Sequence, residues 1–233
     1  MHVSRLFRTR RFGAVLTGTL VLIGSAALAA APAKPAWLLT FTVTPFGGHI
    51  IGNPAAPIKL VEYASYTCGL CGQFETTEAP ILKSQYIATG KVSFEIRNLV
   101  RDEIDLTAAM LARCGGKGRF FGNHRHLMAT QAQWKDGSKI TSPTVAKLQA
   151  GDLLGFMLAA HTELGLDKVM QARGITPAKA KACVTDAAAL DQILAMSNEA
   201  TGPLGLTGTP SFLVNGKQVE AYDVATLKPH LTQ

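Results

Sequence analysis

The sequence has few cysteines, few charged residues and, after Ala30, no apolar run long enough to span a bilayer. Four cysteines are too few for a disulfide-rich scaffold in a chain of this length, so each cysteine needs its own explanation. Charged residues make up 17% and hydrophobic residues 47% of the chain, a composition that excludes intrinsic disorder and allows a sizeable core. The length provides for one large domain or two small ones.

Acidic residues are absent before Glu62, whereas the chain starts with a basic cluster formed by Arg5, Arg8, Arg10 and Arg11. Lys and Arg together number 23 against 16 Asp and Glu, a formal net charge of +7. Without the segment 1–29 the basic total falls by four to 19, and the net charge falls to +3. So small a charge gives no support for a nucleic-acid partner.

The segment 1–29 has the three-part layout of a secretory signal peptide. The basic cluster is followed by an uncharged stretch from Phe12 to Ala30, and Ala27-Leu28-Ala29 has the small residues that signal peptidase reads. A retained membrane anchor is the alternative, but several glycines dilute the hydrophobicity of the stretch. We therefore expect cleavage and export to the periplasm, where disulfides persist.

The next segments alternate between strand and helix patterns. Residues 30–48, rich in Pro, Ala and Gly, are predicted to be a flexible arm. The apolar run at 58–64 predicts a buried strand. A helix is predicted from about residue 68 to 88, kinked or broken at Pro80, and the alternating residues 91–97 predict a second strand.

A long stretch from Asp105 to Asn198 has a helical pattern throughout. Asp105 is predicted to cap its first helix, and further helices are predicted over 119–133, 142–163, 177–183 and 186–200. The segments 211–214 and 217–220 flank Asn215-Gly216 and predict a β-hairpin, after which Asp223 begins a last helix. Because the hairpin must rejoin the sheet begun before it, the helical stretch is predicted to be an insertion.

Cys68 and Cys71 are separated by two residues at the expected first turn of a helix. Unpaired backbone N–H groups and the positive end of the helix dipole favour a thiolate there and lower the pKa of Cys68. The thiolate is the attacking species in thiol–disulfide exchange and also the better leaving group. Cys68 is therefore the candidate nucleophile, and Cys71 is the candidate resolving thiol.

A zinc site or a structural disulfide could also use this pair. Zinc needs two more ligands at suitable spacing, yet Cys114 and Cys183 are isolated and lie far beyond Cys71 in the sequence. His124 and His126 do not share a helical face, so we expect them on a solvated surface. A bridge across so short a loop stabilises little. Redox chemistry therefore explains the pair best, and no metal is predicted.

The segments Glu62–Phe74 and Gly208–Gly216 resemble the DsbA-like branch of the thioredoxin superfamily, and the resemblance covers most of residues 50–233. It implies an α/β, thioredoxin-like fold with an inserted all-helical domain. The expected division is a signal peptide over 1–29, an arm over 30–48, the two parts of the thioredoxin-like domain over 49–102 and 201–233, and the helical insertion over 103–200.

The resemblance also implies roles for individual residues. Pro210 would be cis and face the cysteine pair, and Thr209 would offer backbone hydrogen bonds to a bound peptide. Glu62 matches a buried acid that exchanges a proton with Cys71, because a desolvated carboxyl has a raised pKa. The simpler alternatives are a trans turn at Thr209-Pro210 and a half-exposed Glu62. Apart from the resemblance, Tyr66 and Phe74 flank the cysteine pair, and this position predicts an apolar rim that contacts unfolded substrate.

Cys114 and Cys183 are candidates for a second, non-catalytic disulfide, which some DsbA-like proteins carry in the helical domain. Closing a loop of about 70 residues would contribute roughly 4 kcal/mol of stability. The alternative is two separate buried thiols. Elsewhere, three arginines could contact acidic partners, although solvated faces explain them more simply: Arg97, Arg101 and Arg119.

Gly69-Leu70 departs from the Pro-His that DsbA-type oxidases usually hold between the cysteines, which predicts a less acidic Cys68 and a less oxidising disulfide. Thr209 also resembles the residue found in isomerases and reductases. The prediction is an exported thiol–disulfide oxidoreductase that most simply introduces disulfides into reduced or unfolded secreted proteins. It needs no cofactor beyond its redox-active disulfide, and its expected membrane partner is a quinone-linked oxidase. The alternatives are a reductase or isomerase kept reduced by a membrane donor, a non-catalytic peptide-binding chaperone, and a metal carrier.

Overall fold

The computed structural model describes residues 36–232, and the predicted signal peptide at 1–29 lies outside them. The strands are β1 (Phe41–Val43), β2 (His49–Gly52), β3 (Ile58–Ala64), β4 (Val92–Asn98), β5 (Ser211–Val214) and β6 (Lys217–Val219). The helices are α1 (Gly69–Gln73), α2 (Ala79–Gln85), α3 (Glu103–Ala112), α4 (Lys117–Ala129), α5 (Gln131–Trp134), α6 (Ser142–Gln149), α7 (Leu153–Glu163), α8 (Leu166–Gln171), α9 (Pro177–Val184), α10 (Ala187–Thr201) and α11 (Val224–Leu231). Shorter turns are η1 (Trp37–Leu39), η2 (Phe74–Glu78), η3 (Ile87–Thr89) and η4 (Gly137–Lys139).

The six strands form one mixed sheet in the order β1-β2-β4-β3-β5-β6. β3 and β4 run parallel at its centre, and β5 pairs antiparallel with β3 on the other side. The hairpin of β5 and β6 therefore rejoins the sheet beside the strand that precedes the cysteine pair, as predicted. Because helices cover both faces of β3, all its residues except Lys59 are buried.

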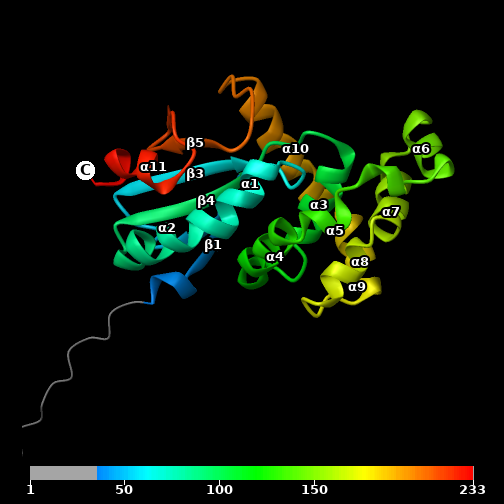
Figure 1. Ribbon diagram of the computed structural model, residues 1–233, viewed down its shortest axis with the longest axis horizontal. Coiled ribbons are helices and arrows are strands. Elements are labelled where there is room, and N and C mark those ends of the chain that lie inside the picture. The colour runs from blue at the N-terminus through cyan, green and yellow to red at the C-terminus, as the bar shows by residue number, and fades with distance from the viewer. Residues whose placement is uncertain (1–35, 233) are drawn as a thin grey trace, which may run out of the picture. The chain divides into compact units, whose positions relative to one another are not determined.

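The two faces of β3 pack against different elements. Leu60 and Ala64 belong to the main core with residues of α1 and α2, whereas Val61 and Tyr63 pack with Ala200 at the end of α10. Glu62 shares the face of Leu60 and therefore points toward the cysteine-bearing helix. Figure 1 shows α1 and α2 along the sheet and the helices α3 to α9 grouped beyond the end where β3 leads into α1.

The predicted helix at 68–88 is interrupted, as expected from Pro80, but the interruption comes earlier. Residues 74–78 form the π-helical turn η2 between α1 and α2. Pro80 then lies in the first turn of α2, where the absence of an N–H group is tolerated. Both cysteines precede this interruption and therefore lie in the regular first turn of α1.

The start of α3 and the extent of the N-terminal arm differ from the predictions. Asp102, rather than Asp105, caps α3, accepting a hydrogen bond from the backbone N–H of Asp105 at 2.7 Å. Asp105 itself is turned into the protein and buried. Part of the predicted arm is also ordered, since η1 and β1 occupy much of 37–43 and the ring of Phe41 stacks on that of Phe121.

The helices after residue 140 are shorter and more numerous than the sequence pattern predicted. The predicted helix at 142–163 is two helices, because Gly151 has a left-handed backbone and Asp152 caps α7. The short helix α8 was not predicted. The hairpin, the cap at Asp223 and the helices corresponding to 177–183 and 186–200 agree with the predictions.

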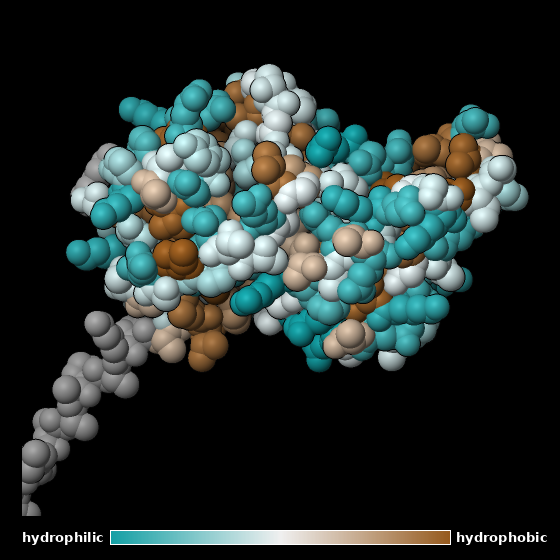
Figure 2. All heavy atoms as spheres, in the orientation of Figure 1, coloured by the Kyte–Doolittle hydropathy of each residue, from teal (hydrophilic) through white to brown (hydrophobic). Residues whose placement is uncertain are grey.

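A disulfide joins Cys114, just after α3, to Cys183 in α9. The pairing that the sequence left open is therefore present in the helical block, defined here as α3 to α10. Figure 2 shows mostly hydrophilic atoms on the visible face of this block, with apolar atoms gathered near α6. Over residues 36–232, every helix is too short or too polar to cross a bilayer.

Candidate active site

The two predicted motifs meet at the end of β3. Cys68 is the N-cap residue of α1, and Cys71 lies one turn inside the helix; both are free thiols. In its protonated form the Cys68 thiol donates to the backbone carbonyl of Thr209 at 3.1 Å, although the two residues are distant in sequence. The Thr209-Pro210 peptide bond is cis, as the resemblance implied.

The two cysteines have opposite acidities. The hydrogen bond from the Cys71 thiol lowers the pKa of Cys68 to about 5 despite partial burial, and the backbone N–H groups of Leu70 and Cys71 assist. The same hydrogen bond, together with burial, raises the pKa of Cys71. The pair therefore shares one proton at neutral pH, with the thiolate on Cys68 and the proton on Cys71.

Glu62 lies beneath this pair and is buried, so the half-exposed alternative is wrong. Burial raises the pKa of its carboxyl well above the usual range, and the neighbouring charge of Glu75 adds to the shift. Its Oε2 atom has no hydrogen-bond partner among the described residues. Glu62 is also near enough that its charge raises the pKa of Cys71. A neutral carboxyl next to the resolving thiol can give it a proton, and once ionised it can take the proton back.

Tyr66 does not form a substrate rim; that prediction is wrong because the side chain is fully buried. Instead, three residues of the helical block bind its three polar groups. Asp105 Oδ1 accepts from its backbone N–H at 2.6 Å, and Gln131 Nε2 donates to its carbonyl at 2.8 Å. Its hydroxyl lies 3.0 Å from His124 Nδ1. Tyr66 therefore ties the loop before Cys68 to the helical block.

Gln131 makes a second contact that the sequence did not indicate. Its Nε2 atom also donates to the carbonyl of Cys68 at 2.8 Å, so one amide group holds the loop on both sides of Thr67. A Cβ atom on Gly72 would lie only 2.7 Å from Gln131 Oε1. Glycine at position 72 is what allows this close approach. A lone glutamine on so short a helix carries no pattern from which this role could be predicted.

His124 is buried, contrary to the prediction of a solvated surface. It lies on the face of α4 that also carries Phe120 and Leu127, a spacing that would have indicated burial. Its Nε2 atom is 3.6 Å from Glu75 Oε2, and Lys83 Nζ pairs with Glu75 Oε1 at 2.8 Å. Although burial opposes it, these two neighbours lower the pKa of Glu75, whose negative charge then helps to keep Glu62 neutral.

Phe74 is also buried, with its ring 4.9 Å from that of Phe212, so it contributes at most an edge to the surface. The exposed apolar side chains beside the cysteines are Leu70 and Tyr222, which are 64% and 74% exposed. Both line a hollow of about 300 Å³ that also reaches Pro210. The apolar rim is therefore built from Leu70 and Tyr222.

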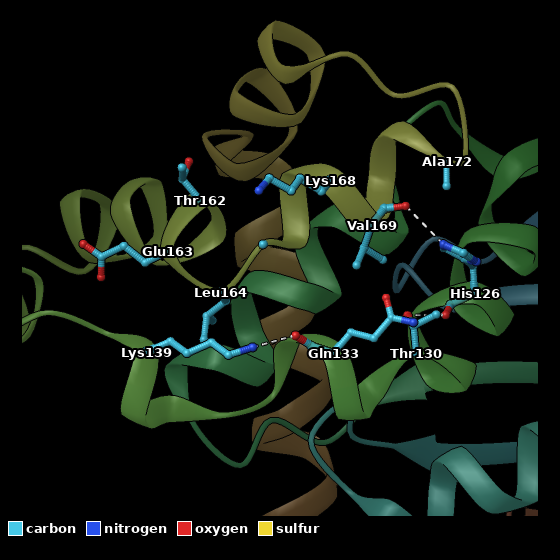
Figure 3. A pocket seen from close by; sticks show the side chains of 11 residues that line it. His126, Thr130, Gln133, Lys139, Thr162, Glu163, Leu164, Lys168, Val169 and Ala172 are labelled. Carbon is cyan, nitrogen blue, oxygen red and sulfur yellow. Dashed lines mark hydrogen bonds between the residues drawn. The ribbon is translucent and has the colours of Figure 1, made fainter.

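A different hollow, of about 480 Å³, lies in the helical block between α4, α5, α7 and α8 (Figure 3). It contains no cysteine. His126 Nε2 lies 3.1 Å from the carbonyl of Val169, and Lys139 donates to the carbonyl of Gln133 (Figure 3). Two of its basic side chains are thus bound to the backbone. In the part of the chain that the structure describes, no three His, Cys, Asp or Glu side chains gather as a metal site.

Known proteins resemble this chain over most of its length. A family model described as thioredoxin matches residues 45–232. A protein-disulfide isomerase from Novosphingobium aromaticivorans has a similar structure, with a TM-score of 0.72, 33% identity, and coverage of 80% of this chain and 98% of that one. α-DsbA1 of Wolbachia pipientis has a TM-score of 0.63 at 22% identity, covering 84% of this chain and 94% of that one, which shows a shared fold.

A curated relative from Rickettsia bellii is named a protein-disulfide oxidoreductase. It is 32% identical over 179 residues, which cover 76% of this chain and 61% of that protein. A second, from Rickettsia conorii, carries the same kind of name and is 31% identical over 197 residues, covering 84% of this chain and 63% of that protein. The chain thus spans about six-tenths of the length of these curated relatives.

Replacing Gln131 by leucine should change the acidity of Cys68, although both cysteines remain in the protein. The carbonyls of Tyr66 and Cys68 would lose a buried donor, which should lower the free energy of unfolding by about 1–3 kcal/mol. The freed loop should also raise the pKa of Cys68, measured by thiolate absorbance in the reduced protein. Gln133→Leu, at an exposed neighbouring position, is the control. An unchanged pKa in Gln131→Leu would contradict the role given to this side chain.

The reduction potential of the cysteine pair should depend on pH with a change of slope near pH 5. In the reduced protein the pKa of Cys68 is about 5, below its ordinary value. The thiolate therefore stabilises the reduced fold above the ordinary pKa, and this stability is lost as the pH falls through 5. Reduction takes up two protons below pH 5 and one above it, so the potential should fall by about 59 and then about 30 mV per pH unit. Equilibration with a thiol buffer at several pH values measures this, and a single slope would contradict it.

Proposed function

Because the chain belongs to the thioredoxin family, we propose that it is a DsbA-like thiol–disulfide oxidoreductase that exchanges its Cys68–Cys71 disulfide with cysteines of exported proteins. The observation that carries the proposal is the joint position of three groups. Cys68 Sγ lies at the surface end of the pair beside Thr209, Cys71 is buried behind it, and a neutral carboxyl lies beneath.

In the oxidising direction, a substrate thiolate attacks Cys68 of the disulfide. The Cys68–Cys71 bond breaks, a substrate–Cys68 bond forms, and Cys71 leaves with the electron pair and takes a proton from Glu62. A second substrate thiolate then attacks the substrate sulfur of the mixed disulfide. Cys68 leaves as a thiolate, which its low pKa favours. The substrate has lost two electrons, and the enzyme is left as the dithiol.

Reoxidation of the dithiol then needs an acceptor of two electrons, for which we assign a quinone-linked membrane oxidase. The basic and apolar segment at 1–29 supports export to the periplasm as the place of this exchange. Exported proteins that still carry reduced cysteines are the proposed substrates. The proposed cycle uses the redox-active disulfide and the carboxyl of Glu62, without a bound cofactor.

A second candidate is a reductase or isomerase of the same compartment. Gly69-Leu70 between the cysteines favours it, because neither residue offers a side-chain donor or a charge to the Cys68 thiolate. The name of the Novosphingobium structure, a protein-disulfide isomerase, agrees with this direction. Both candidates use the same attack at Cys68 and differ in the potential of the pair.

The reduction potential of Cys68–Cys71 decides between these directions. It is measured by equilibration with glutathione in a Cys114→Ala/Cys183→Ala variant, so that a single couple titrates. A potential near about −120 mV is expected for an oxidase, and one near about −200 mV or lower for a reductase or isomerase. Cys68→Ser should abolish exchange with a reduced protein substrate. Exchange that survives in Cys68→Ser would refute the whole proposal and favour a non-catalytic binding protein.

Glu62→Gln should slow the step in which Cys71 gains or loses its proton. The amide has nearly the same shape but cannot transfer a proton, and the loss should be about 100-fold. The rate of reaction with dithiothreitol, followed against pH, tests this, and the titration of the Cys68 thiolate near pH 5 should survive. Glu103→Gln, in the first turn of α3, is the control. A Glu62→Gln variant with the wild-type rate and pH profile would remove Glu62 from the mechanism.

A further inference from the structure

Charges of opposite sign stand on the two sides of Cys68 and Leu70. On the side of the helical block, a hollow of about 500 Å³ is lined by Cys68, Arg101 and Thr209 among others, and Arg101 gives this lining its positive charge. On the other side, the hollow that Leu70 shares with Tyr222 is lined by two acids, Glu78 and Asp223. The two hollows share Leu70 and Thr209 in their linings, so a polypeptide that lies across both passes Cys68.

The cations on the first side are not neutralised by ion pairs. Within residues 36–232, the Arg101 side chain forms no salt bridge, and neither does that of Lys135. Lys135 Nζ lies 3.9 Å from the place of a Cβ atom on Gly69, so it stands beside the cysteine motif. An acid directly follows each cation in sequence, but the carboxylate of Asp102 is bound by Thr67 Oγ1 and the backbone N–H of Asp105, and that of Asp136 is bound by Ser138. The positive charge of Arg101 and Lys135 is thus available to a partner.

The acids on the second side are held in place by hydrogen bonds without a cation. Glu78 Oε2 accepts from the backbone N–H of Val224 at 3.0 Å. Asp223 caps α11 by accepting from the backbone N–H of Thr226 at 2.7 Å, and its contacts with Thr226 lower the pKa of its carboxyl. Backbone N–H groups at the start of α11 thus hold both carboxylates in place. Neither acid forms a salt bridge among the described residues.

We propose that these charges select the partner: the enzyme favours a segment with an acidic residue on the Arg101 side of the reacting cysteine and a basic residue on the Glu78 side. The proposal rests on the exchange reaction at Cys68 and adds a substrate class to it. When the partner sulfur is placed at Cys68, residues one or two positions away lie roughly 3 to 7 Å to either side. They then lie over the hollows that Arg101 and Glu78 line, and exposed charges interact over a Debye length of about 10 Å at 0.1 M salt.

Two peptides of identical composition test the proposal: Asp-Gly-Cys-Gly-Lys and its reverse, Lys-Gly-Cys-Gly-Asp. They have the same net charge, so general electrostatic attraction is equal and only the order of charges differs. The rate constant with which each peptide thiol reduces the Cys68–Cys71 disulfide is measured. The rate of each peptide with a small uncharged disulfide corrects for its intrinsic reactivity. Each exposed charge pair changes a rate by up to about fivefold, so the two peptides should differ about fivefold at low salt and converge at high salt.

Reversing the cations should reverse the preference. In Arg101→Glu/Lys135→Glu the disfavoured peptide should become the favoured one. Arg125→Glu/Lys168→Glu makes the same change of net charge at two other positions of the helical block and should keep the wild-type preference. If the reversal variant does not fold, Arg101→Gln should still reduce the difference between the rate constants of the two peptides. The ratio of these rate constants in the wild-type protein is also a test.

Equal rates for the two peptides in the wild type would overturn this inference, and so would a preference that survives reversal of Arg101 and Lys135. Reaction with dithiothreitol, which carries no charge, is measured beside them. If dithiothreitol reduces the disulfide while the peptides are not distinguished, the proposed function stands and only the charge selection fails. If dithiothreitol does not react either, the exchange activity itself is refuted.

Discussion

Gln131 spans the space between the helical block and the loop before Cys68 with one side-chain amide, and the geometry of the cysteine pair depends on this contact. Its Nε2 atom binds the carbonyls of Tyr66 and Cys68, which lie on either side of Thr67. Buried carbonyls are costly to leave without a donor, so the loop cannot move away from α5 without losing stability. Cys68 is thereby held at the N-cap of α1, where the backbone N–H groups favour its thiolate.

The helical block is consequently part of the active site. Besides Gln131, it supplies Asp105 to the backbone of Tyr66 and His124 to the Tyr66 hydroxyl. His124 also approaches Glu75, whose charge helps to keep the carboxyl of Glu62 neutral. A change on α4 can therefore reach the acidity of Cys71 through Glu75 and Glu62, although this helix carries no cysteine of the reactive pair.

The residues around the cysteine pair form two groups, a buried group proposed to carry out the thiol chemistry and an exposed group proposed to select the substrate. The groups of the proposed thiol chemistry are almost wholly buried, since Cys71 and Glu62 are shielded and Cys68 is only slightly exposed. Leu70 and Tyr222, by contrast, are exposed at the surface. Such a division allows the surface residues to differ between related enzymes while the reaction at Cys68 stays the same.

Periodicity, turn residues and spacing along the chain were enough to predict the strand before Cys68, the hairpin at its two-residue turn and the helices that begin near Asp186 and at Asp223. Local backbone preferences decide these features. Spacing and the resemblance also led to Cys68, Cys71, Glu62 and Pro210 as candidates. Only the tertiary structure placed Asp105, His124 and Gln131 around Tyr66 and buried Tyr66 itself. These contacts join residues far apart in the chain through single hydrogen bonds, which leave no periodic trace in the sequence. The order of amino acids thus determined which groups could react, and the packing of the helical block decided how they are held.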